Sequence, residues 1–204
     1  MICAPVSFAE VHEAPSLEWM TVNSPLIIRG RILEVQRKPV AHESHLELAL
    51  EDLIVQVKEV LKGEFVQDKV YIRRFSYGLS HSTALTWKES EADFLFFLTK
   101  DIPQTDIPMI LYVEHWTLTF DYPYGPVNLL HPEEAAEYLV SATFAAPKTG
   151  EHILKIVRDT LVHLSDYQSR SETIEVPEEA EAFKELWGGS SVYLIVPIRN
   201  EKEP

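Results

Sequence analysis

The chain has 204 residues, 46% of them hydrophobic, so it can bury a substantial core as one large domain or as a domain with an appendage. Its 32 acidic and 18 basic residues give a formal net charge of -14, which would repel nucleic acid and anionic lipid, so we expect no nucleic-acid partner. No apolar stretch approaches the roughly 18 residues of a membrane-crossing helix, so we expect no membrane span.

The first residues bear on location. Met1 to Ala9 (MICAPVSFA) resemble the end of a signal peptide, because the stretch is mildly apolar and ends in a small residue. The charged region and the longer apolar region of a complete signal are missing, so both an exported and a cytosolic protein remain open. Cys3 is the only cysteine, which excludes an internal disulfide and a cysteine-rich zinc site within one chain.

The first predicted element is a short helix that begins after Ser16. Ser16 is a good N-cap residue, Leu17 to Met20 follow it, and Asn23-Ser24-Pro25 ends the helix. We expect Trp19 to cover one end of a sheet.

Three runs rich in β-branched residues then follow each other. Leu26 to Val35, Asp52 to Gly63 and Lys69 to Phe75 each alternate in the manner of a pleated strand, which predicts three neighbours in one antiparallel sheet. Gly30 lies inside the first run and indicates a bulge or sharp bend. Arg37 to Ser44 reads as a polar connection.

His45 to Leu61 is open to two interpretations. As a strand pair it alternates with a phase slip at Glu51-Asp52, which would be a bulge or a turn. As a helix it carries an apolar stripe spaced four and three residues apart, which would end at Gly63. The cluster of β-branched residues favours the strand, and the prediction of a barrel depends on that choice.

The middle of the chain alternates between polar and apolar segments. Ser76 to Ala92 is polar and is expected to be an irregular surface excursion, whereas Asp93 to Thr99 predicts a strand buried on both faces. A turn is expected at Asp101 to Pro108. Met109 to Asp121 then reads as one long or two short strands, and Asp121 to Pro126 as a tight loop.

The remaining sequence mixes helices and strands. Helices are predicted at Pro132 to Ser141, Gly150 to Leu164 and Pro177 to Trp187, the second with a strong amphipathic stripe. Strands are predicted at Glu172 to Val176 and Ser191 to Ile198. Leu194, Ile195 and Val196 are all apolar, so we expect the last strand to be central or covered rather than an edge, with the C-terminal third docked onto the main sheet.

These elements predict an α+β protein. Residues 1–125 are expected to form a small, antiparallel OB-like β-barrel or a strongly twisted sheet, with two to four helices packed on it. Residues 126–204 are expected to dock onto the same core, either as one domain with it or as a separate part.

The order of strands in the first half resembles that of netrin-like domains and tissue inhibitors of metalloproteinases, which are five-stranded OB-type barrels. The resemblance covers roughly residues 3 to 101 and rests on these segments: Cys3 and Pro5, Asn23 to Val35, Asp52 to Gly63, Lys69 to Arg74, and Glu91 to Asp101. Ser171 to Ile198 is similar in style to bacterial proteins of unknown role that are exported in many cases. The second resemblance implies a location outside the cytoplasm.

Histidines and Cys3 are the candidate metal ligands. His42 and His45 stand three residues apart, whereas the zinc hydrolase pattern H-E-x-x-H needs four, so they form at most a weak metal site and a solvated loop explains them better. The netrin-like resemblance suggests that Cys3 could chelate the zinc of a target protease. Ser190 and Ser191 follow two glycines without the order of a nucleophile elbow.

Aromatic residues are the candidate contact residues. Trp87 lies in the polar excursion and is the expected exposed member, while the aromatic group Tyr112, Trp116, Phe120, Tyr122 and Tyr124 could line a groove. A single tryptophan in a loop more commonly packs back onto the barrel, and this is the other interpretation of Trp87.

No pair of residues stands out as acid, base or nucleophile, and no motif calls for a cofactor. We therefore expect a non-enzymatic, extracytoplasmic binding or interaction module for an unknown protein or small ligand, with Ser76 to Ala92 and Asp101 to Pro108 as its contact surface. One alternative is a hydrolase or metalloenzyme that brings His81, His115 and His131 together by folding. Another, by resemblance alone, is a protease inhibitor.

Overall fold

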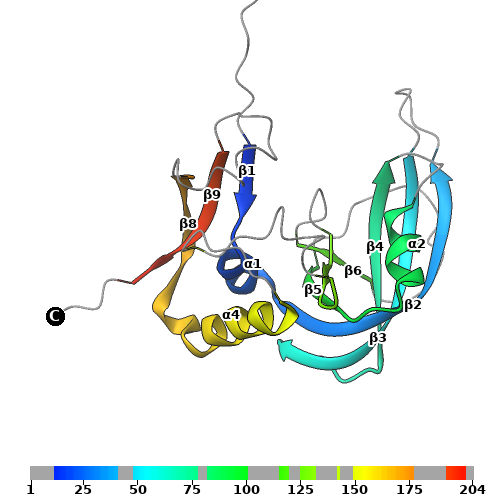
Figure 1. Cartoon of the computed structure of the whole chain (residues 1–204), viewed down its shortest axis with the longest axis horizontal. Helices are drawn as coiled ribbons and strands as arrows, with labels where there is room; N and C mark the ends of the chain where they lie inside the picture. The colour runs from blue at the N-terminus through cyan, green and yellow to red at the C-terminus, as the bar shows by residue number, and fades with distance from the viewer. Residues whose placement is uncertain are drawn as a thin grey trace, which may run out of the picture.

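The computed structural model describes residues 12–40, 48–77, 82–100, 115–119, 125–131, 142, 149–176 and 192–200. The helices in this part are α1 (Leu17–Asn23), α2 (Thr83–Glu89) and α4 (Gly150–Val162), with a 3-10 turn, η1, at Leu164–Asp166 (Figure 1). The strands are β1 (His12–Pro15), β2 (Leu26–Val40), β3 (Leu48–Lys62), β4 (Lys69–Tyr77), β5 (Phe94–Thr99), β6 (His115–Leu118), β7 (Val127–Asn128), β8 (Tyr167–Glu175) and β9 (Val192–Arg199).

Strands β2 to β6 close into a barrel. Their order is β2-β3-β4-β6-β5, and β5 pairs again with β2, while β7 adds to β5 outside the ring. The expected α+β fold with an OB-like barrel is confirmed. Four of the pairs in the ring are antiparallel, but β4 and β6 run parallel, because α2 and β5 intervene between them and bring β6 back beside β4 in the same direction.

β3 is a single strand, so the extended interpretation of this segment is confirmed and the helix is wrong. The expected phase slip at Glu51-Asp52 is also wrong, because the register with β4 is unbroken from Leu48 to Gln56. Glu51 and Asp52 stay in the strand since their cross-strand partners on β4 are Arg74 and Arg73. Complementary charge keeps both acids in the ladder.

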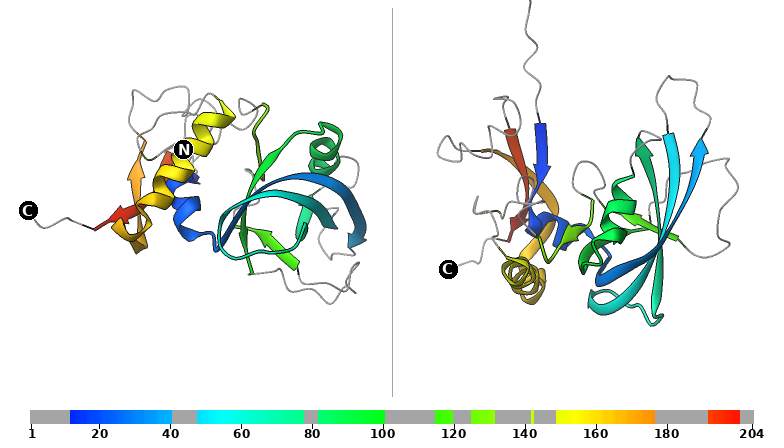
Figure 2. Two further views of the ribbon diagram at one scale, coloured as in Figure 1. Left: turned by 90° about the horizontal axis from the view of Figure 1, so that it is seen from below. Right: turned by 45° about the vertical axis from the view of Figure 1, so that its right-hand side comes forward.

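β2 bends sharply at the predicted glycine. Its register with β3 shifts between Arg29 and Gly30, and a Cβ on Gly30 would lie 2.5 Å from the Gln56 carbonyl oxygen. Two long strands can therefore curve around the barrel, as the left panel of Figure 2 shows for β2 and β3. The expected polar connection from Arg37 is partly wrong, because β2 continues to Val40.

The predicted irregular excursion after β4 contains a helix. β4 runs to Tyr77, and α2 begins after Ser82, whose hydroxyl accepts a hydrogen bond from the Leu85 N–H at 3.2 Å. The Ser82 hydroxyl also donates to Glu51 at 2.6 Å. This second bond ties the start of α2 to the barrel, which explains why a polar stretch becomes helical here.

Alternate residues of β5 serve two cores, as a strand buried on both faces requires. Phe94, Phe96 and Leu98 face the barrel interior, whereas Leu95 and Phe97 face outward to α1 and α4. The interior also takes residues from β2, β3, β4 and α2, including Leu26, Ile28, Ile32, Leu53, Val55, Val70, Ile72 and Ala84. The outer core is completed by Leu17, Met20, Ile27, Val127, Ile153, Leu154 and Val157.

The ends of the chain join in a second sheet. β9 lies between β1, which is parallel to it, and β8, which is antiparallel. The expectation that the last strand is central is confirmed, since its neighbours are β1 and β8, and the C-terminal part meets the barrel through α4, whose Ile153, Leu154 and Val157 pack with Leu95 and Phe97 of β5. In Figure 1 the second sheet lies apart from the barrel, with α1 and α4 between them.

β1 and α1 thus lie with the C-terminal elements, across the predicted boundary at residue 125. Lys62 anchors α1 to the barrel: its Nζ donates to the carbonyls of Thr21 and Val22 at 2.7 and 2.8 Å. Positive charge at the C-terminal end of a helix is favourable.

Some predictions fall on residues that the structure does not describe. These are the helices at Pro132 to Ser141 and Pro177 to Trp187, the turn at Asp101 to Pro108, and most of the segment Met109 to Asp121, of which only β6 and Thr119 are described.

Candidate functional site

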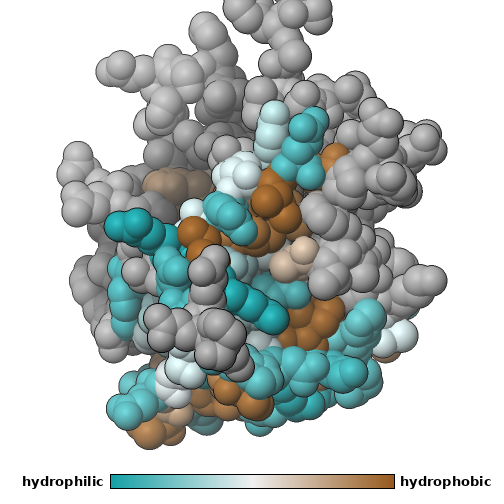
Figure 3. Space-filling model, turned by 90° about the vertical axis from the view of Figure 1, so that its left-hand side faces the viewer, coloured by the Kyte–Doolittle hydropathy of each residue, from teal (hydrophilic) through white to brown (hydrophobic). Residues whose placement is uncertain are grey.

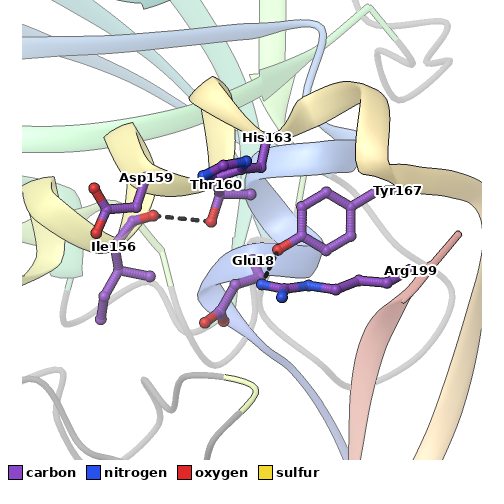
Figure 4. A pocket seen from close by; sticks show the side chains of 7 residues that line it. All are labelled: Glu18, Ile156, Asp159, Thr160, His163, Tyr167 and Arg199. Atoms are coloured by element: carbon purple, nitrogen blue, oxygen red, sulfur yellow. Dashed lines mark hydrogen bonds between the residues drawn. The ribbon is translucent and has the colours of Figure 1, made fainter. Parts of the chain in front are cut away.

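A polar pocket lies where α1, α4 and the second sheet meet. Its volume is about 150 Å³, and its lining comes from four elements and the turn after α4: Glu18, Ile156, Asp159, Thr160, His163, Tyr167 and Arg199 (Figure 4). A water molecule occupies about 30 Å³ in the liquid, so the pocket has room for about five non-hydrogen atoms. It suits a small molecule or a side chain.

Local sequence signals place the helical part of the lining. Ser16 caps α1 by accepting from the Trp19 N–H at 3.0 Å, and Glu18 follows in the first turn. Thr149 caps α4 in the same way, and the apolar stripe of α4 turns Thr160 inward, to 4% exposure. The Ser16 N–H also donates to the Ile195 carbonyl of β9 at 2.9 Å, which brings the start of α1 against the second sheet.

A cross-strand pair forms the sheet side of the pocket. Tyr167 begins β8 and Arg199 ends β9, and the two are register partners. The Arg199 Nη2 donates to the Tyr167 hydroxyl oxygen at 3.0 Å, and its guanidinium carbon lies 5.2 Å from the centre of the tyrosine ring. Since the hydroxyl accepts this bond, its own proton is available for donation to a ligand.

Glu18 is the partly buried acid of the pocket. Burial raises the pKa of Glu18, while a hydrogen bond from the Ala142 N–H at 2.8 Å and the charge of Arg199 oppose the rise. The neutral carboxyl therefore persists to higher pH than it does in an exposed glutamate. In Figure 4 its carboxyl group lies beside the Arg199 guanidinium.

Charge is distributed unevenly across the pocket. Asp159 lies on the α4 side, whereas Tyr167 and Arg199 lie on the opposite side, with Glu18 between them (Figure 4). The Thr160 hydroxyl donates to the Ile156 carbonyl at 2.8 Å, so its proton is held within the helix. The pocket thus offers an acceptor at Asp159, donors at Arg199 and Tyr167 on the opposite side, and the Glu18 carboxyl between them.

The surface around the second sheet is mixed. Figure 3 shows polar and apolar side chains interspersed over the described part of this face. The most exposed large apolar residue of α4 is Val162, at 76%.

Trp87, the predicted contact residue, lies on α2 and is half-buried. Its ring packs on the barrel core beside Phe94, with 6.5 Å between ring centres, and the Arg74 guanidinium stacks over it at 4.8 Å. The interpretation that Trp87 packs back onto the barrel is confirmed, whereas its expected position in an irregular loop is wrong, because it lies on α2. A contact role for Trp87 stays a prediction.

The predicted histidine sites are only partly described. His42, His45, His81, Cys3, Ser190 and Ser191 lie outside the described residues, as do Tyr112, Phe120, Tyr122 and Tyr124. His115 is 1% exposed on β6, with its Nε2 3.5 Å from Asp52, whereas His131 is exposed after β7. Within the described ranges, no group of three His, Cys, Asp or Glu side chains is placed to hold a metal ion.

The two acids of β3 lead to buried ion pairs. Arg73 holds Asp52 with two hydrogen bonds of 2.7 and 2.6 Å, and all three of Asp52, Arg73 and His115 are at most 2% exposed. Glu51 is 3.0 Å from Arg37 and accepts from Ser82. At such burial a substrate atom does not reach these groups, so we interpret the cluster as structural.

Sequence reasoning missed every pocket residue. Glu18, Asp159 and His163 occur within helices or turns as ordinary polar residues, and Tyr167 and Arg199 stand 32 positions apart. No short motif relates them. Only the pairing of β8 with β9 and the packing of α1 against α4 bring them together.

Comparison of the chain with protein-family models and with curated proteins gave no match. Among the described residues, no helix combines the length and apolar character needed to cross a membrane.

Proposed function

We propose that the protein is a binding module whose pocket between α1, α4 and the second sheet holds a small zwitterion, a molecule with an ammonium group and a carboxylate. The observation that supports this most is the separation of charge across the pocket, with Asp159 at one end and the Arg199–Tyr167 pair at the other. An arginine beside a hydroxyl donor recognises a carboxylate well, and a carboxylate recognises an ammonium.

The size of the pocket limits the ligand. About 150 Å³ is smaller than the roughly 300–1,000 Å³ of drug-sized sites, so the ligand has the size of a small amino acid or of a chain end. Binding is favoured over catalysis because the Thr160 hydroxyl is hydrogen-bonded to a backbone carbonyl rather than to a base. A location outside the cytoplasm belongs to this proposal and rests on the resemblance of Ser171 to Ile198.

The proposal is tested by NMR titration of the full chain at constant ionic strength. Glycine, ethylammonium and acetate are the three probes, and the backbone signals of Thr160 and Tyr167 report the pocket. Glycine is expected to bind more tightly than either singly charged probe, because it alone satisfies both ends. Saturable shifts with glycine that reach both residues support the proposal.

A matched pair of variants makes the test specific. Asp159→Asn removes the acidic end and is expected to weaken glycine binding about tenfold, the loss of one charge-assisted contact. Asp68→Asn makes the same change at an exposed position between β3 and β4 and is expected to leave the affinity for glycine unchanged. Absence of saturable shifts with glycine, or equal weakening by both variants, would overturn the proposal.

A further inference from the structure

Three basic side chains converge on one carboxylate on the outer surface of the barrel. Arg29 donates to Asp93 through Nη2 at 2.9 Å and through Nε at 3.2 Å, and Arg31 approaches the same carboxylate at 3.5 Å. Lys58 also pairs with it. Arg29 and Arg31 share a face of β2 on either side of Gly30, while Lys58 comes from β3 and Asp93 directly precedes β5.

The charges of this cluster do not balance. Three cations face one anion, which leaves two positive charges in excess on a chain whose formal net charge is -14. Glu59 is the cross-strand neighbour of Arg29, but it pairs with Arg158 of α4 at 2.9 Å and so does not compensate for the excess. The local field is thus opposite in sign to that of the whole protein.

Donors in the cluster are left unused. The Arg31 Nε is buried, and the described residues provide no hydrogen-bond acceptor for it. Within the described part of the chain its guanidinium makes only the long contact to Asp93, although a guanidinium carries five N–H donors. The side chains of Arg29, Arg31 and Lys58 remain 36%, 41% and 37% exposed, so an anion from solvent can reach them.

We propose that Arg29, Arg31 and Lys58 form a binding site for a phosphate monoester, with Asp93 holding the three side chains in place. A phosphate monoester carries a charge of about -1.5 to -2 at neutral pH, which matches the two excess positive charges. Guanidinium groups bind phosphate oxygens in a bidentate manner, and the lysine adds a point charge. This site lies on the barrel and is independent of the zwitterion pocket.

Asp93 remains ionised under the conditions in which phosphate is a dianion. Burial by itself would raise the pKa of Asp93, but hydrogen bonds from Lys58 and Arg29, together with their charges, outweigh burial and lower it. The carboxylate therefore orients the cations over the whole neutral range, so little arrangement is needed when an anion binds.

The test is an NMR titration of the full chain with inorganic phosphate, O-phosphoserine and acetate at one fixed, low ionic strength. Both phosphates are expected to give saturable shifts at Arg31 and Lys58, with acetate at least about tenfold weaker because it carries one charge. If O-phosphoserine fails to bind where inorganic phosphate does, the monoester assignment is wrong. If acetate binds as tightly as phosphate, the phosphate assignment is wrong.

Two arginine variants separate the site from general electrostatics. Arg31→Gln is expected to weaken phosphate binding about tenfold. Arg170→Gln changes the net charge of the chain equally at an exposed position on β8 and is expected to change the affinity less than twofold. Lys58→Gln is a second site variant should Arg31→Gln fold poorly. No saturable binding to the unmodified chain, or equal weakening by Arg31→Gln and Arg170→Gln, would overturn the proposal.

Discussion

Two adjacent acids on β3 show how this chain accommodates buried charge. Glu51 and Asp52 are both fully buried, and they point to opposite sides of the strand, so each needs a separate set of partners. Arg73 forms a bidentate pair with Asp52, while Ser82 and Arg37 serve Glu51. A buried charge without such partners would cost several kcal/mol. The alternation of apolar residues does not indicate these distant partners. For this reason the sequence pattern alone suggests a bulge or turn at Glu51-Asp52.

Glu18 predicts a pH dependence at the scale of one residue. Because burial raises its pKa, the folded state holds this proton more tightly than the unfolded state. Its contribution to stability is therefore present at low pH and lost as pH rises through the folded-state pKa. Glu18→Gln has no carboxyl that titrates, so it removes this pH-dependent loss of stability. Its side-chain oxygen can still accept a hydrogen bond from the Ala142 N–H. Urea unfolding over the acidic to neutral pH range should show a smaller decline of the unfolding free energy with rising pH for the variant than for the unmodified chain.

The control for this prediction is Glu172→Gln, at an exposed position on β8. Its unfolding free energy should follow that of the unmodified chain at each pH. If the Glu18→Gln and unmodified curves were parallel, Glu18 would not be the group whose proton is held more tightly in the folded state.

At the scale of elements, four strands of the barrel could be predicted from the sequence because apolar and polar side chains alternate along them. β2, β3, β4 and β5 lie close to their predicted places, and α1 and α4 begin at serine and threonine caps. α2 was missed because its signal is weak: a short polar segment whose stability depends on the bond from Ser82 to Glu51 and on packing of Trp87. Propensity alone does not contain those contacts.

Gly30 predicts a large effect at the bend of β2. A Cβ at this position would lie 2.5 Å from the Gln56 carbonyl oxygen and 2.7 Å from the Val55 Cγ1, so either the strands separate or the bend relaxes. Gly30→Ala should lower the unfolding free energy by about 1–3 kcal/mol. Chemical denaturation measures the change. Val66→Ala, at a 99% exposed position, should change it by less than about 0.5 kcal/mol. An equally small effect of Gly30→Ala would show that β2 and β3 are not closely paired here.

At the scale of the molecule, α1 and α4 connect the barrel to the second sheet. Ile153, Leu154 and Val157 of α4 pack in one cluster with Ile27, Leu95 and Phe97 of the barrel. The same cluster contains Leu17 and Met20 of α1, whose N-cap bonds to β9. Since this core is shared, we expect the two parts to unfold together.

Ile153→Ala tests that coupling. The side chain is fully buried in the cluster that joins α1 and α4 to the barrel, so truncation should cost about 2–4 kcal/mol and lower the midpoint of one common transition. Tryptophan fluorescence and far-UV circular dichroism should report the same midpoint before and after the change. Val162→Ala on the same helix is 76% exposed and should change stability by less than about 0.5 kcal/mol. Two separate transitions would contradict the coupling.

The amino-acid sequence specified most of the local structure: which segments extend, where Gly30 bends a strand, and where α1 and α4 begin. It did so because alternation, capping and glycine geometry act between residues that are near each other in the chain. Long-range packing, in contrast, joins residues 12–15 to residues 192–199 in a second sheet and brings Glu18 together with Tyr167 and Arg199 in one pocket. A periodic pattern tells which face of a strand is buried but not which distant strand lies beside it, so sites assembled from remote segments depend on the packing of the whole chain.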